Sequence, residues 1–301
     1  MEIISAMPGA LAQGLIWGIM AIGLYITYKI LDFADLTVDG SLCTGAAVCA
    51  VLIAAGANPW LAILAAFFAG AIAGLITGLL HTLLGIPAIL SGILTQLMLW
   101  SINLKILGKA NLSLNPRVMN LAVSMLETWK TVAVVAAVLA ALIAVLYWFF
   151  GTEIGSSIRA TGSNPEMCRS QGINTELNKV IALMLSNAIV ALSGAFLAQY
   201  QGFADINMGR GAIVIGLAAV IVGLAVFSKA GKNFAVRLIG VVVGSIIYYV
   251  VYQTVIGLGL DKDLLKLFSA LVVAVFLAVP HWKNKFASVK KTEKKSEDGN
   301  A

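Results

Sequence analysis

Carboxylates and small polar side chains stand between long apolar runs at two places in this chain. The first reads Phe33-Ala34-Asp35-Leu36-Thr37-Val38, and the second, 170 positions later, reads Phe203-Ala204-Asp205-Ile206-Asn207-Met208. If the surroundings are lipid, each ionised side chain costs about 2.5–3.5 kcal/mol on insertion scales, which marks it as a functional candidate. The structural alternative is that each carboxylate accepts hydrogen bonds from the backbone where the next helix starts.

The first phrase also contains an acidic spacing that could hold a metal. Asp32, Asp35 and Asp39 have the DxxDxxxD spacing of intramembrane prenyltransferases, in which carboxylates hold Mg²⁺ against a diphosphate. Such an enzyme needs a second acidic cluster, and the remaining aspartates do not form one. The two histidines and three cysteines have no metal-ligand spacing either, so no metal site is expected.

Composition indicates what surrounds these residues. The chain is 60% hydrophobic and 11% charged, whereas about 25% of a soluble domain is charged. A bilayer core about 30 Å thick is crossed by about 20 helical residues. We therefore expect an all-α polytopic membrane protein of about 8–10 transmembrane helices. The candidate spans are residues 9–31, 40–56, 59–83, 87–107, 131–150, 179–201, 211–228, 235–256 and 264–280.

An internal repeat relates these spans. The offset of 170 continues beyond the phrase, where Gly70-x3-Gly74 matches Gly240-x3-Gly244. Repeat one (about 9–107) and repeat two (about 179–280) would be separated by one extra span, a 4+1+4 arrangement that inverts the second repeat. Inverted repeats are typical of transporters, in which the solute path lies at the repeat interface. Small residues four apart let helices approach closely, either within the chain or in a homodimer: Gly70, Gly74, Gly78, Gly240 and Gly244.

Polar side chains on the spans and in the repeated phrase are the candidates for the solute path or its gate. We expect fewer than half of them to line the path, because some must bond only to neighbouring helices. The candidates are Asp35, Thr37, Asp39, Ser41, Thr95, Gln96, Asn103, Asn187, Gln199, Asp205 and Asn207.

The distribution of Lys and Arg predicts the orientation. With the N-terminus outside and the C-terminus cytoplasmic, 13 basic residues lie inside and 7 outside, in agreement with the positive-inside rule. Residues 1–280 would form one transmembrane domain. Residues 281–301 would be a basic, solvated and disordered cytoplasmic tail, or alternatively a segment attracted to anionic headgroups.

The longest polar stretch before the tail is residues 151–178, which this orientation places in the cytoplasm. Asn164-Pro165-Glu166 is typical of a helix start, and Gly172 of a helix end. We therefore expect a short helix on the membrane surface, connected to spans at both ends. Such a helix can transmit motion from a soluble protein bound below it.

This stretch resembles a known family. The run Ile158-Arg159-Ala160-x-Gly162-x-Asn164-Pro165, followed by Gly172-Ile173, resembles the coupling-helix loop of ABC importer permeases of the branched-chain amino acid type, which share a fold with ribose-type permeases. The first phrase combines features of both branches, and the overall sequence resembles the subgroup associated with tryptophan or tyrosine uptake. Cys168 stands where the family usually has Ala.

The resemblance implies a permease subunit of the bacterial cytoplasmic membrane that imports a small amino acid-like solute, preferably an aromatic one. It implies a permease homodimer, a cytoplasmic ABC ATPase that carries the ATP and Mg²⁺, and an extracytoplasmic binding protein. It implies no cofactor in this chain, no enzyme activity of its own and no nucleic acid. The residues expected to couple it to the ATPase are Arg159, Ala160, Gly162, Asn164, Pro165, Glu166, Arg169, Gly172 and Ile173.

Three other functions stay open. A sugar-importing ABC permease would share every feature above. An ion-coupled secondary transporter would share the inverted repeats but would need no docking helix. A prenyltransferase would consume a prenyl diphosphate in the presence of Mg²⁺.

Overall fold

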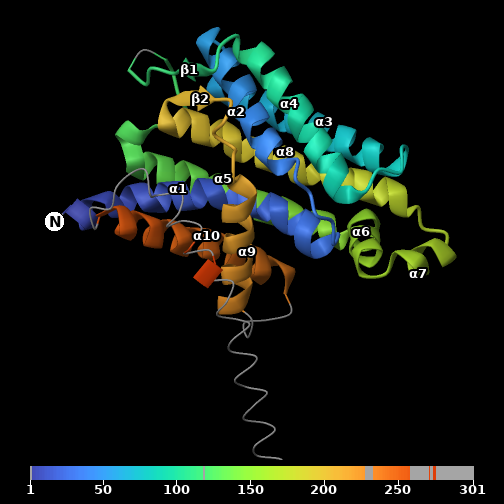
Figure 1. The fold of residues 1–301 in the computed structure, drawn as a ribbon. Coiled ribbons are helices and arrows are strands. Elements are labelled where there is room, and N and C mark those ends of the chain that lie inside the picture. The colour runs from blue at the N-terminus through green and yellow to red at the C-terminus, as the bar shows by residue number, and fades with distance from the viewer. Residues whose placement is uncertain (1, 118, 228–232, 258–270, 272–273, 276–301) are drawn as a thin grey trace, which may run out of the picture.

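The structure is a computed structural model that describes residues 2–117, 119–227, 233–257, 271 and 274–275 (Figure 1). Most of the predicted span 264–280 and the whole tail 281–301 lie outside the described residues. The predictions made for those segments therefore remain predictions.

Helices make up most of the described chain. Eight of the nine predicted spans correspond to helices, and six of these helices are long and apolar enough to cross a membrane. The two shorter ones, α2 and α9, occupy corresponding positions in the two predicted repeats. The helices are α1 (Glu2–Tyr25), α2 (Val38–Ala54), α3 (Pro59–Thr82), α4 (Ala88–Leu107), α5 (Thr128–Gly151), α6 (Glu153–Ser163), α7 (Pro165–Ser170), α8 (Thr175–Gln201), α9 (Ala212–Val226) and α10 (Phe234–Gly257).

Short irregular elements connect some of these helices. A π-helical turn, Ile26–Ile30, extends α1 at its C-terminal end, and a 3₁₀ turn, Met125–Glu127, precedes α5. A π turn inserts one extra residue per turn into a helix, and such turns occur often at functional sites. Nothing in the apolar pattern of this span predicts it.

One small sheet corrects the all-α expectation. Strand β1 (Asn111–Ser113) pairs antiparallel with β2 (Phe203–Asp205), so the start of the second phrase is extended. The reason is local: Gly202 adopts φ 76°, which ends α8, and its carbonyl oxygen accepts a 2.7 Å hydrogen bond from the Leu114 N–H. The chain therefore leaves the helix beside β1 and pairs with it.

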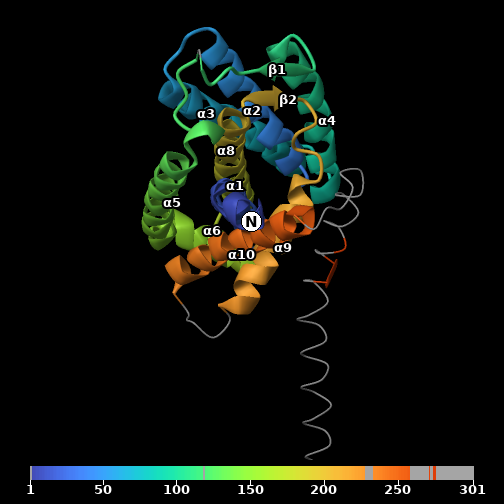
Figure 2. The same ribbon diagram turned by 90° about the vertical axis from the view of Figure 1, so that its left-hand side faces the viewer.

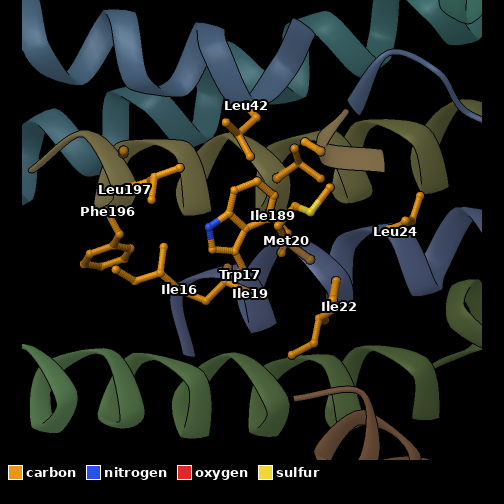
Figure 3. Close-up of a cluster of buried hydrophobic side chains, with 14 of the residues drawn as sticks. Ile16, Trp17, Ile19, Met20, Ile22, Leu24, Leu42, Ile189, Phe196 and Leu197 are labelled. Atoms are coloured by element: carbon orange, nitrogen blue, oxygen red, sulfur yellow. The ribbon is translucent and has the colours of Figure 1, made fainter. Parts of the chain in front are cut away.

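Helices α1 and α8 form the centre of the molecule. About four-fifths of the apolar window of each helix is buried (83% and 78%), against 17% for α5, which leaves α5 at the periphery. Figure 3 shows where the central helices meet: Trp17 and Met20 of α1 lie beside Leu42 of α2 and Ile189 of α8. This apolar contact holds together two halves that are distant in sequence.

Small residues set the distances between the helices. The Cβ of any larger residue at Gly70 or Gly74 would collide with the backbone of α8, at Asn187 and Leu183 respectively. Gly78 lies against Val180 of α8, where an added Cβ would make a tight contact. In the second half, Gly240 and Gly244 instead face α9, where Gly244 lies against Ala219. All five predicted packing glycines thus lie at helix contacts within one chain.

The bundle has two distinct ends. Figure 1 shows α6 and α7 together at one end, with β1 and β2 towards the other, and Figure 2 views the bundle from the end where the chain begins. The π-helical turn after α1 and the start of α8 both contact α6, so Lys29, Arg159 and Arg169 belong to the same end. The predicted orientation places this basic end in the cytoplasm.

Candidate transport pathway and docking face

The carboxylate of Asp35 is fully buried and hydrogen-bonded. Its Oδ1 accepts from the Thr37 backbone N–H (2.9 Å), and its Oδ2 accepts from Nδ2 of Asn187 (2.7 Å), near the middle of α8. Ser41 Oγ donates to Oδ1 of the same Asn187 (2.6 Å), and the hydroxyls of Thr37 and Thr77 lie 2.7 Å apart. This network connects the start of α2 to α8 and α3.

The second phrase reproduces the local turn in a more exposed setting. Asp205 Oδ1 accepts a 2.7 Å hydrogen bond from the Asn207 backbone N–H, as Asp35 does from Thr37. Asp205 Oδ2 faces Nδ2 of Asn111 at 3.4 Å on an exposed part of the surface. The two phrases therefore share this local turn, although only the second begins as a strand.

Asp39 joins the two short helices. It lies in the first turn of α2, and its two carboxylate oxygens accept from the backbone N–H groups of Gly211 (3.0 Å) and Ile213 (2.9 Å), where α9 begins. A carboxylate at a helix N-terminus satisfies unpaired N–H groups and interacts favourably with the helix dipole. The starts of α2 and α9 therefore meet, with this carboxylate between them.

Two other predicted pathway residues only bond to their neighbours. Thr95 Oγ1 donates to the Ser91 carbonyl within α4 (3.0 Å). Gln199 is fully buried; its Oε1 accepts from the Ala122 N–H (2.9 Å) and its Nε2 lies 3.3 Å from Cys49 Sγ. Neither residue lines the cavity described next.

A cavity of about 230 Å³ opens beside the meeting point of α2 and α9. Three of the predicted pathway residues line it: Asp39, Gln96 and Asn103. Sequence reasoning missed Arg210 and Trp100, although Arg210 follows the second phrase closely and Trp100 shares the α4 face of Gln96 and Asn103. The full lining is Asp39, Gly40, Cys43, Ile93, Gln96, Leu97, Trp100, Asn103, Ile206 and Arg210.

In the polar stretch 151–178, α7 forms as the sequence predicts. Asn164 precedes the helix, and its Oδ1 accepts a 3.1 Å hydrogen bond from the Met167 N–H, with Pro165 in the first position. Gly172 adopts φ 78° just after the helix ends. Glu166 and Arg169 are exposed and form a loose ion pair at 3.5 Å.

Helix α6, which precedes α7, is a feature that the sequence reasoning missed. Its buried face carries Ile158. Nδ2 of Asn178, in α8, donates to Ser157 Oγ (2.6 Å) and Thr161 Oγ1 (2.9 Å). Gly162 lies directly against the carbonyl of Ile30, where a larger residue would collide. The side chains of Arg159 and Ala160 are exposed on the outer face.

Further contacts fasten α6 and α7 to the bundle. Cys168 is buried on α7, and Arg169 Nε donates to Thr175 Oγ1 at the start of α8 (3.1 Å). Helices α6 and α7 are thus joined by contacts to α8 and to the turn that follows α1. Across the described residues, no group of three or more His, Cys, Asp or Glu side chains could hold a metal ion.

Comparison with known proteins identifies the family. Residues 7–280 match the family described as the branched-chain amino acid transport system permease component. The chain is 40% identical to the tyrosine transport system permease protein of Clostridioides difficile (strain R20291), with 97% of this chain and 96% of that protein aligned. It is 32% identical to the uncharacterized protein RP368 of Rickettsia prowazekii (strain Madrid E), with 89% and 95% aligned.

Two solved structures resemble this chain weakly. One is a metal-chelate type ABC transporter in an inward-facing conformation, with a TM-score of 0.47, 15% identity, and 92% of this chain and 84% of that chain covered. The other is PsaBC from Streptococcus pneumoniae in complex with Fab, with a TM-score of 0.38, 14% identity, and coverage of 82% and 89%. The assignment rests on the sequence matches, which confirm the resemblance drawn from the loop motif: this multi-pass membrane protein belongs to the permease component family of branched-chain amino acid transport systems.

Proposed function

We propose that this chain is the permease subunit of an ABC importer that moves an amino acid-like solute, preferably aromatic, into a bacterial cell. The family membership and the tyrosine transport permease among its relatives support this solute class.

The observation that carries the proposal is the docking face formed by α6 and α7. Its outer side presents charged groups, Arg159, Glu166 and Arg169, while its inner side is fastened to α8 by Asn178 and to α1 by Gly162. Charges at an interface guide the encounter and set the register more than they add affinity. A soluble ATPase bound there would move the bundle through rigid contacts.

The packing supports inverted repeats. In the predicted repeats, α3 corresponds to α10, and α8 corresponds to α1. Helix α3 packs on α8, and α10 packs on α1 in the same way. Both phrases form the same carboxylate turn, and the short helices α2 and α9 correspond. Short segments at corresponding positions of two halves point to a solute site between them.

In the proposed cycle, ATP closes a pair of ATPases, α6 and α7 shift, and the two repeats rock around the junction of α2 and α9. Two permease copies form the path, and an extracytoplasmic binding protein delivers the solute. A permease with this role lies in the bacterial cytoplasmic membrane. The match to a permease family favours transport over the prenyltransferase alternative.

The test is affinity purification of the full chain from native membranes under mild conditions, with mass spectrometry of its partners. The expected partner is a Walker-motif ATPase in near-equal amount, together with a binding protein that binds L-tyrosine or L-tryptophan. No ATPase after mild crosslinking, combined with uptake that collapses with an uncoupler while ATP is maintained, would contradict the proposal and support an ion-coupled transporter.

A further inference from the structure

The cavity beside α2 and α9 presents opposite charges that do not pair with each other. Asp39 and Arg210 both line it, yet no ion pair links Arg210 to any acidic side chain of the described residues. Arg210 is exposed, while both oxygens of Asp39 accept backbone hydrogen bonds and keep further lone pairs for a ligand. Guanidinium binds carboxylates with two parallel hydrogen bonds, and a carboxylate attracts an ammonium group.

Asn103 supplies an independent sign of a ligand. Its side chain is only 1% exposed and lines the same cavity, with Nδ2 donating weakly to the Gly40 carbonyl (3.4 Å). Its Oδ1 is buried and has no hydrogen-bond partner in the described part of the chain. Leaving a buried acceptor unsatisfied is unfavourable, so a donor that the described chain does not supply would stabilise it.

The remaining walls suit an apolar side chain. Ile93, Leu97 and Trp100 lie along α4 on one side of the cavity. Aromatic rings bury large apolar areas and pack favourably against other rings. The volume of about 230 Å³ corresponds to roughly eight waters at about 30 Å³ each, which suits one small solute.

From these observations we infer that the cavity is a recognition site for a zwitterionic aromatic amino acid. Arg210 binds the solute carboxylate, Asp39 accepts from its ammonium group, and Trp100 packs against its ring. Asn103 Oδ1 accepts from the same ammonium group when the amide side chain turns toward the cavity. This inference rests on the proposed function, because it gives the imported solute a site within the permease itself.

The test uses the full-length permease, purified with its ATPase and without the extracytoplasmic binding protein, in lipid nanodiscs. Saturable binding of radiolabelled L-tyrosine is measured against two analogues: tyramine, which lacks the carboxylate, and 3-(4-hydroxyphenyl)propionate, which lacks the ammonium group. The unaltered protein is expected to bind each analogue at least tenfold more weakly than L-tyrosine.

Each variant should lose one specific discrimination. Arg210→Gln is expected to bind L-tyrosine at least tenfold more weakly while binding tyramine as before. Asn103→Leu is expected to weaken L-tyrosine binding while leaving 3-(4-hydroxyphenyl)propionate unaffected. The matched controls are Arg117→Gln, a change to another exposed arginine outside the cavity, and Trp148→Ala, which removes a ring 70% exposed on α5; both should bind like the unaltered protein.

The outcomes separate this inference from the proposed function. Suppose that an ATPase co-purifies and uptake is normal. If the unaltered protein then binds no L-tyrosine, or if Arg210→Gln and Arg117→Gln bind it equally well, the site assignment is wrong and the importer stands. If the permease binds L-tyrosine with these discriminations but no ATPase accompanies it, the proposed ABC mechanism is wrong and the site stands.

Discussion

Asp39, in the first turn of α2, accepts a 2.9 Å hydrogen bond from the backbone N–H of Ile213, where α9 begins. The two residues are 174 positions apart and belong to opposite halves of the chain. Their contact brings together the starts of the only two apolar helices of the described chain that are shorter than a full span. The carboxylate of Asp39 thus joins the starts of α2 and α9, next to the hydrogen bond that the Gly209 N–H donates to Cys43 Sγ (3.1 Å).

Replacing Asp39 by Asn should loosen this junction. The neutral amide keeps one acceptor oxygen, so one of the two hydrogen bonds to α9 is lost, at about 1 kcal/mol for a helix cap. The expected result is a lower thermal unfolding midpoint in detergent. The control Asp32→Asn changes an exposed carboxylate and should leave the midpoint unchanged; equal midpoints for the two variants would contradict the assigned role.

The two repeated aspartates should differ in their effect on stability. Asp35→Ala removes a carboxylate that is 1% exposed and leaves Nδ2 of Asn187 without this acceptor in the protein interior. Asp205→Ala removes the same local turn at a partly exposed position. The first variant should be less stable than the second by about 1–3 kcal/mol, the cost of an unsatisfied buried group. Denaturant unfolding in detergent measures the difference, and equal losses would show that Asp35 is structurally no more important than Asp205.

Gly74→Ala tests the close contact of α3 with α8. A Cβ there collides with the carbonyl of Leu183, and overpacking typically destabilises by about 1–3 kcal/mol. Gly151→Ala is the matched control, because no atom lies within 4 Å of its added Cβ. The melting temperature should fall in Gly74→Ala and hold or rise in Gly151→Ala. A fall of the same size in both would point to a general helix effect instead of the contact.

Asn178→Leu should weaken the connection between α6 and α8. The variant loses both hydrogen bonds, to Ser157 and Thr161, while the exposed outer face of α6 and α7 stays intact. Uptake is therefore expected to fall several-fold while the ATPase still co-purifies. The neighbouring change Glu176→Gln, at an exposed position, should affect neither property. Loss of the ATPase from Asn178→Leu would mean that this residue supports the docking surface itself.

Much of the fold could be predicted because lipid imposes a simple length and composition rule. Eight predicted spans have their helices, and α7 starts at Pro165 because Asn164 caps it, as the local residues indicate. The family resemblance came from the same loop. Each of these features depends on residues that are close together in sequence.

The features that sequence reasoning missed depend on contacts between distant residues. Strand β2 forms because β1, some 90 residues earlier, lies beside it, with Asn111 opposite Asp205. Trp100 and Arg210 share a cavity only because α4 and the start of α9 both pack near α2. Helix α6 has few apolar residues, and its contacts with α8 come from Asn178. No local pattern carries this information.

Site-specific photocrosslinking shows whether an ATPase binds the face formed by α6 and α7. A photoreactive side chain replaces Met167, which is 57% exposed on α7, or Leu126, which is 64% exposed in the turn before α5. Leu126 thus lies at the N-terminal end of α5, whereas α6 and α7 follow its C-terminal end. If α6 and α7 bind the ATPase, position 167 crosslinks to it and position 126 does not. An ATPase crosslink from position 126, or none from position 167 in a membrane that contains the assembled transporter, would contradict binding at this face.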